Sequence, residues 1–176
     1  MTQPRPLAGR LAALGAVGAA GIAATVVGYF EGRSLVAYVD PIGIPTICEG
    51  WTQGVKLGDI ATDADCDAKT LAAIIEADDT FQRWVPDHVK DEMSHEAHAA
   101  FLSFIYNVGP GGPGVKDGFV YLKSGRHSTM LTRLRAGDIK GACNQLPYWT
   151  KAGGRELRGL VIRRQSEQSL CLNGLD

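Results

Sequence analysis

The sequence predicts a mainly helical α+β fold in which one small β element precedes several helices. Two short runs of β-forming residues flank a turn at residues 35–48, and helical periodicity dominates from about residue 62 onward. The 176 residues include 45% hydrophobic and 21% charged side chains, a composition that supports a buried core and excludes disorder.

The β element is predicted to be a hairpin. Its expected strands, residues 35–39 and 44–48, flank the turn sequence Asp40-Pro41-Ile42-Gly43. Pro45 lacks the amide hydrogen that a central strand requires, so the second strand is expected at an edge.

The helices are predicted to follow without an internal repeat. Thr62 or Asp63 is suited to cap a first helix that runs to about Phe81, and a second helix is expected from about Asp91 to Val108. A Gly/Pro-rich loop follows at residues 109–118, and further helices are expected at about 127–136, 138–146 and 155–170.

The first thirty residues form a separate segment. Arg5 and Arg10 precede residues 11–30, a stretch of 20 residues without a charge that is just long enough to span a bilayer. Because 11 of these 20 residues are Gly or Ala, we expect a weak membrane anchor that exports the rest of the chain. A cleaved secretory signal is the alternative, and a soluble buried helix is disfavoured because the stretch has no polar face.

The charges divide the chain into an acidic and a basic half. The totals are 18 basic and 19 acidic residues, but residues 31–120 hold 6 basic and 15 acidic ones, whereas residues 121–170 hold 10 and 3. Overall neutrality argues against a nucleic-acid partner, while the basic half is suited to an anionic polymer.

The four cysteines agree with export to an oxidising compartment. Because Cys48, Cys66, Cys143 and Cys171 form no Cys-x-x-Cys pair, disulfides are favoured over zinc. Pairing of nearest neighbours, Cys48 with Cys66 and Cys143 with Cys171, is our preference among three possible connectivities, and four reduced cysteines are the alternative.

Glu31, Asp40 and Thr46 are the candidate catalytic residues, within sixteen residues around the predicted hairpin. The apolar flank of Glu31 favours the protonated carboxyl of a general acid, whereas Asp40 in a turn can stay ionised. Two carboxyl groups in unlike environments are what glycoside hydrolysis requires, and the Thr46 hydroxyl is suited to orient a water. We expect no metal or cofactor, since His95 and His98 lack the spacing of a zinc motif.

The spacing of these three residues resembles the catalytic signature of phage-type lysozymes, the endolysins of glycoside hydrolase family 24. The similarity extends from Glu31 to about Leu172, and the cysteines and Gly/Ala-rich N-terminus look most like signal-arrest-release endolysins of lambdoid phages. Further blocks similar to that family, in the same order, are residues 103–109, 128–131, 137–138, 149–154 and 159–160, then Arg163, Arg164 and Glu167.

The resemblance implies a two-lobed lysozyme-like fold, with a small β sheet in the N-terminal lobe and a helical C-terminal lobe. Residues 1–30 would be the signal-anchor helix and residues 31–176 the muramidase domain. The implied reaction is hydrolysis, with inversion, of the β-1,4 bond between N-acetylmuramic acid and N-acetylglucosamine in peptidoglycan. Glu31 would be the general acid, Asp40 the base that activates water and Thr46 the residue that positions it, while Tyr106, Ser128 and Asn144 fall where the family contacts sugar.

The implied partners are peptidoglycan strands and, through residues 11–30, the inner membrane of the host. The protein would be a monomer, tethered on the periplasmic side and then released into the periplasm. Two rival functions stay open: a tethered peptidoglycan-binding protein without activity, and a secreted muramidase with a cleaved signal.

Two departures from the family pattern affect the expected cleft. Glu49 and Trp51 lie in Cys48-Glu49-Gly50-Trp51-Thr52, where the family often has Gly-x-Gly-His-Thr, so substrate contacts at this edge are expected to differ. The loop at residues 110–126 looks longer than usual, which would reshape or cover part of the cleft.

Overall fold

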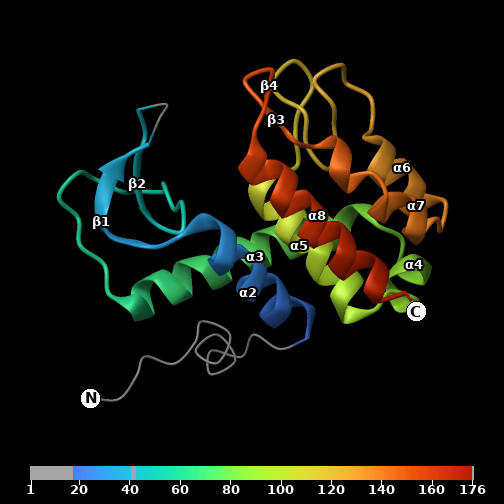
Figure 1. Ribbon diagram of the computed structural model, residues 1–176, viewed down its shortest axis with the longest axis horizontal. Helices are drawn as coiled ribbons and strands as arrows, with labels where there is room; N and C mark the ends of the chain where they lie inside the picture. Colours follow the sequence, from blue (N-terminus) through green and yellow to red (C-terminus); the bar gives the residue numbers. More distant parts are fainter. Residues whose placement is uncertain (1–17, 41–42, 176) are drawn as a thin grey trace. The chain divides into compact units, whose positions relative to one another are not determined.

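The computed structural model describes residues 18–40 and 43–175, and it confirms a mainly helical α+β fold with small sheets (Figure 1). The chain divides into two compact units, residues 1–75 and 76–176, and the boundary falls within helix α3, Asp63–Trp84. The helix begins at the predicted cap, because the Thr62 amide donates to Asp65 Oδ2 at 2.8 Å and the Asp65 amide donates to Thr62 Oγ1 at 3.2 Å.

The predicted hairpin is confirmed in the first unit. Strands β1, Ser34–Val39, and β2, Pro45–Cys48, pair antiparallel, with Tyr38 opposite Thr46 and an irregularity between Ser34 and Tyr38. Pro45 opens β2 in a sheet of two strands, where a missing amide hydrogen is tolerated. The inner side of the hairpin contributes to a small core made of Ile47, Cys48, Ala61 and Cys66.

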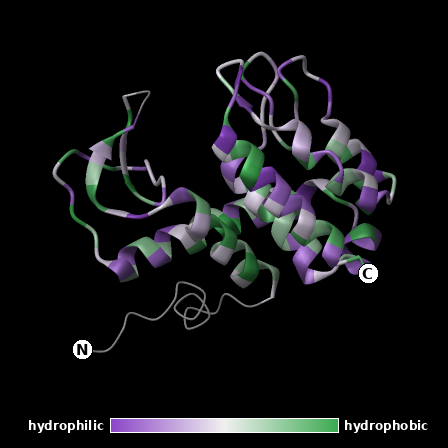
Figure 2. Cartoon of the chain, in the orientation of Figure 1, coloured by the Kyte–Doolittle hydropathy of each residue, from purple (hydrophilic) through white to green (hydrophobic). Residues whose placement is uncertain are grey.

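The N-terminal hydrophobic stretch contains helix α2, Ala19–Glu31, whose apolar residues are green in Figure 2. Ala23, Ala24 and Val27 are fully buried, whereas Tyr29 is 80% exposed. In the two described ranges, no helix is both long and apolar enough to cross a membrane. The part of the expected span at residues 11–17 lies outside the described residues.

The second unit is helical, and α5, His95–Val108, packs along α8, Arg158–Asn173 (Figure 1). The helix expected from about Asp91 to Val108 is confirmed as α5, but it begins later than predicted. A separate helix, α4, Asp87–Asp91, ends at Asp91, and Ser94 starts α5 by accepting a hydrogen bond from the Ala97 amide at 3.1 Å. The remaining elements are α6, Thr129–Arg135, α7, Ile139–Cys143, the 3₁₀ helix η1, Leu146–Tyr148, and a sheet, not predicted, of β3, Lys151–Ala152, and β4, Arg155–Glu156.

Each unit contains one disulfide, Cys48–Cys66 in the first and Cys143–Cys171 in the second. This is the pairing that the sequence favoured. All four cysteines are buried, so each disulfide lies in a core rather than at the surface.

The middle of the loop at residues 110–126 is anchored in the core of the second unit, whereas residues 113–117 and 123–126 are exposed. Phe119 and Val120 are buried, and Phe119 lies 6.1 Å from Phe81 between ring centroids. Gly111 has φ +76°, and a Cβ there would lie 2.2 Å from the Tyr121 carbonyl oxygen, so only glycine fits this turn.

Candidate active site

Glu31 is the last residue of α2 and directly precedes the hairpin. Gly32 follows with φ 67°, a left-handed conformation that glycine adopts without steric cost, and β1 begins two residues later. The half-buried Glu31 side chain therefore lies at the junction between helix α2 and the hairpin.

Asp40 and Thr46 lie at the turn end of the hairpin. Asp40 follows β1, where its Oδ1 atom accepts a hydrogen bond from the Ile44 amide at 2.8 Å. Thr46 is on β2, is 3% exposed, and donates its hydroxyl hydrogen to the Ile44 carbonyl oxygen at 2.9 Å. With its proton used in this way, the Thr46 hydroxyl can still accept a hydrogen bond, for example from a water.

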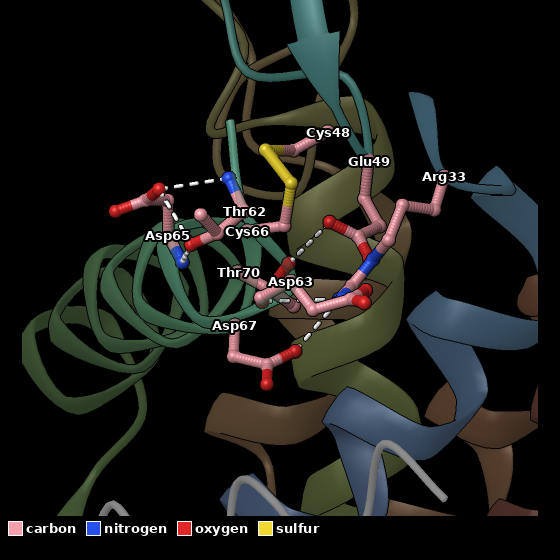
Figure 3. A network of polar contacts seen from close by, with 9 residues as sticks. All are labelled: Arg33, Cys48, Glu49, Thr62, Asp63, Asp65, Cys66, Asp67 and Thr70. Carbon is pink, nitrogen blue, oxygen red and sulfur yellow. Dashed lines mark hydrogen bonds and ion pairs between the residues drawn. A yellow bond between two sulfur atoms is a disulfide. The ribbon is translucent and has the colours of Figure 1, made fainter. Parts of the chain in front are cut away.

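A polar network around Arg33, which the sequence analysis missed, lies at the base of the hairpin (Figure 3). The Arg33 guanidinium donates to Glu49 at 2.5 Å, to Asp63 at 2.6 Å and to Asp67 at 2.7 Å. Burial alone would lower the pKa of Arg33, but its hydrogen bonds to Asp67, Asp63 and Glu49 raise that pKa above its usual value. The only sequence signal was that Arg33 is the one cation between Glu31 and Lys56.

Glu49 lies in the interior of the first unit. It is 3% exposed and bound by Arg33 and by the Thr70 hydroxyl, at 2.9 Å, so it belongs to the interior and not to an exposed edge. Trp51 is half-buried, with Lys69 Nζ 5.4 Å from the centroid of its ring. Among the described residues, Cys48, Glu49 and Cys66 form the group of metal-ligand type, but the disulfide uses both sulfur atoms.

Three residues of the second unit were expected to contact sugar. Tyr106 is half-buried on α5, and Asn144 is exposed at the end of α7, where it accepts a hydrogen bond from Gln168 at 3.0 Å. Both stay proposed contacts.

The sugar contact expected at Ser128 stays a prediction, and the structure gives its hydroxyl a structural role. Its side chain is fully buried, and its hydroxyl donates to the Phe119 carbonyl at 2.5 Å and accepts from the Leu131 amide at 3.0 Å as the N-cap of α6. The Ser128 hydroxyl is therefore already occupied as a helix cap and has no exposed surface in this structure.

The second unit also contains a buried network built from residues far apart in the sequence. Arg164 pairs with Glu167 and Asn107 and donates to the Trp149 carbonyl at 3.1 Å. Glu167 also binds Arg163 at 3.0 Å. Asn107, Trp149 and Arg164 lie on the wall of a cavity of about 730 Å³, together with Lys116 and Lys151. Segments 103–109, 149–154 and 163–167, which resembled phage lysozymes individually, thus converge in space.

The fold and the convergence of these segments define a lysozyme-like protein. A family model described as phage lysozyme matches residues 28–167. The chain belongs to the phage lysozyme family, and it is a glycoside hydrolase.

The chain is similar to named relatives over most of its length. It is 37% identical over 148 residues to a SAR-endolysin of Enterobacteria phage PA-2, with 82% of this chain and 78% of the relative covered. The crystal structure of the active form of P1 phage endolysin Lyz matches with a TM-score of 0.81 and 27% identity, over 97% of this chain and 93% of that one. The secreted inactive form of the same endolysin gives a TM-score of 0.51 and 28% identity, over 70% and 77%.

Proposed function

We propose that this protein is a signal-arrest-release endolysin that cleaves the glycan strands of peptidoglycan and lyses the bacterial host. The observation that carries the proposal is the position of Glu31, at the end of α2 and directly before the hairpin that holds Asp40 and Thr46. Family membership supports the same residues, since this segment lies within the matched range.

The proposed reaction is a single displacement with inversion. Glu31 donates its proton to the glycosidic oxygen as the bond to the anomeric carbon breaks. Asp40 accepts a proton from a water that attacks the anomeric carbon from the opposite face, and Thr46 orients this water through a lone pair of its hydroxyl oxygen. The Ile44 amide holds the Asp40 carboxylate in a fixed orientation for this step. Tyr106 and Asn144 are the proposed sugar contacts.

Substitution of the acid tests this chemistry. E31Q keeps the size of the side chain and removes the proton donor, so release of reducing ends from purified peptidoglycan should fall by at least roughly 100-fold. E76Q, at an exposed Glu of α3, is the matched control and should behave like the parent. Equal activity of E31Q and the parent would remove Glu31 as the acid, and an inactive parent would favour a non-catalytic peptidoglycan-binding protein.

We further propose that residues 1–30 tether the enzyme to the inner membrane before release and that residues 31–176 form the muramidase domain. The names of the relatives support tethering, and the greater likeness to an active than to an inactive endolysin supports α2 as part of the released form. In the tethered form Glu31 would be held at the headgroups, one residue beyond the span, and the protein would be exported but silent. Loss of the membrane potential would then release the weakly held segment.

Release can be tested by strengthening the anchor. Leu at positions 15, 18 and 21 in place of Gly should keep the protein in the membrane fraction and block lysis, because each Leu favours insertion. Unchanged release would contradict the tether.

A cleaved secretory signal is the competing explanation for residues 1–30, and the burial of residues in α2 argues against it. Cleavage near Ala24 would cut the helix whose Ala23, Ala24 and Val27 are buried. The N-terminal mass of the periplasmic product distinguishes the two: a mass that begins at Met1 supports release, and one that begins near Ala24 supports cleavage.

A further inference from the structure

Arg33 connects the candidate acid to the interior of the first unit. It lies two residues after Glu31, and its guanidinium reaches three carboxylates that come from the end of β2 and the start of α3 (Figure 3). The bonds to Glu49, Asp63 and Asp67 measure 2.5, 2.6 and 2.7 Å, and Nη1 also donates to the Asp63 carbonyl at 3.2 Å. These hydrogen bonds point in three different directions and therefore hold the planar guanidinium in one orientation.

The three acceptors, which we call the Arg33 socket (Glu49, Asp63 and Asp67), are held by contacts of their own. Glu49 accepts from the Thr70 hydroxyl at 2.9 Å. The Cys48–Cys66 disulfide joins the residue before Glu49 to the residue before Asp67, and Figure 3 shows it directly beside the network. The socket is thus built entirely from residues beyond the proposed tether.

The charges make the socket dependent on a cation. The side chains of Glu49 and Asp67 are only 2% and 5% exposed, and Asp63 adds a third carboxylate at 53% exposure. A buried carboxylate without a positive partner is costly, because the interior does not replace its hydration. Arg33 brings a positive charge to all three carboxylates, and hydrogen bonding to them raises its own pKa.

We propose that Arg33 is a positioning residue for Glu31: docking of its guanidinium in the socket fixes the junction between α2 and β1 and so places the acid. The inference rests on the proposed function, in which Glu31 is the general acid. Only Gly32 separates the two residues, so a pinned Arg33 confines the Glu31 backbone to within about two residue lengths, roughly 7 Å. While residues 11–30 are in the bilayer, Arg33 is held near its surface, and docking completes the site after release.

The test separates positioning from stability with four variants of the released protein. R33M removes the positive charge and the hydrogen bonds that Arg33 gives to the buried acids, so it is expected to melt early. R33M/E49Q/D67N neutralises those acids as well and should restore the melting temperature. R33K keeps the charge on a side chain that cannot bind three carboxylates in fixed directions. R83M makes the same substitution as R33M at an exposed arginine of α3 and serves as the control.

Initial rates of reducing-end release give kcat and KM on purified peptidoglycan. We expect kcat of the triple variant to fall roughly 10- to 100-fold with KM within about twofold of the parent, because a small displacement of the acid slows chemistry more than binding. R33K should show a smaller fall in kcat at a melting temperature near that of the parent.

Parental kcat in the triple variant would overturn the inference and leave Arg33 a purely structural residue. If the triple variant melts early, the kcat of R33K becomes the deciding measurement. A folded R33K with the parental kcat would overturn the inference. Failure of the proposed function looks different, since then the parent and R83M would also release no reducing ends.

Discussion

Asp40 and Thr46 bind the two polar groups of the same residue: the amide of Ile44 donates to the Asp40 carboxylate at 2.8 Å, and its carbonyl accepts from the Thr46 hydroxyl at 2.9 Å. The Asp40 amide also donates to the Ile44 carbonyl, at 3.0 Å. The proposed base and the proposed water-positioning residue are therefore set by one piece of backbone, and a shift of Ile44 would move both.

Loss of the Thr46 hydroxyl should separate activity from folding. T46V keeps the volume and the strand propensity but removes the oxygen that we propose to hold the water, so kcat should fall by roughly 10- to 100-fold. T46S retains the hydroxyl and should keep most of the activity. The measurement is reducing-end release beside thermal melting of both variants, and a fully active T46V would rule out this role for Thr46.

Removal of the Ser128 hydroxyl should affect stability alone. S128A deletes the N-cap of α6 and leaves the Leu131 amide without its partner, which costs about 1 kcal/mol of unfolding free energy. Since Ser128 is fully buried, KM for peptidoglycan should not change. Urea denaturation and steady-state kinetics check both statements, and a raised KM with parental stability would restore Ser128 as a sugar contact.

The two disulfides should differ in their effect on catalysis. Sequence separations of 18 and 28 residues predict a loss of about 3 to 4 kcal/mol for removal of either crosslink. C143A/C171A should keep the parental kcat at 25 °C, whereas C48A/C66A should also lower kcat, because Cys48 adjoins Glu49 in the Arg33 socket. Chemical denaturation and kinetics of the two double variants make the comparison. Equal kcat values for both would show that the first disulfide does not support the active site.

Acid sensitivity should depend on Asp78. His98 Nε2 lies 2.9 Å from Asp78 Oδ1, and this interaction lowers the pKa of Asp78, while partial burial opposes the shift and Gln82 adds to it. Because the folded pKa lies below the unfolded value of about 3.9, this contribution to stability is complete above that pH and is lost as the pH falls through the folded pKa.

D78N should therefore reduce the loss of urea stability as the pH falls below about 4. Asp79, the exposed neighbour of Asp78, supplies the control. D79N should show the same pH dependence of urea stability as the parent. An unchanged slope in D78N would mean that other carboxylates cause the acid sensitivity.

Much of the fold could be predicted because its signals are local. The hairpin follows from two β-rich runs around Asp40-Pro41-Ile42-Gly43, and the start of α3 follows from Thr62. The break before α5 was missed because the apolar periodicity of residues 97–105 was extended backwards to Asp91. Ser94, followed by Glu96 and Ala97, was a local signal for the true helix start. The β3–β4 sheet has two-residue strands, too short for any periodic signal.

The candidate site could be predicted only where its residues are close in sequence. Glu31, Asp40 and Thr46 fall within sixteen residues, and a resemblance to known enzymes identified them. The pairing of Arg33 with Glu49 and Asp67 joins residues up to 34 positions apart, and it depends on how the hairpin meets α3. For the same reason the sequence did not indicate that Glu49 is buried, since its burial is a tertiary property. The capping role of Ser128 was also missed, because a cap and a ligand contact use the same hydroxyl.

Both disulfides begin after residue 47, and the first cysteine in the sequence is Cys48. On the proposed function, both disulfides can form while the chain is still tethered to the membrane. Oxidation of the cysteines by the host would therefore precede release, which follows the loss of the membrane potential. The tethered protein would then accumulate with both disulfides already formed. The time of lysis would depend on the loss of the membrane potential and not on the redox state of the periplasm.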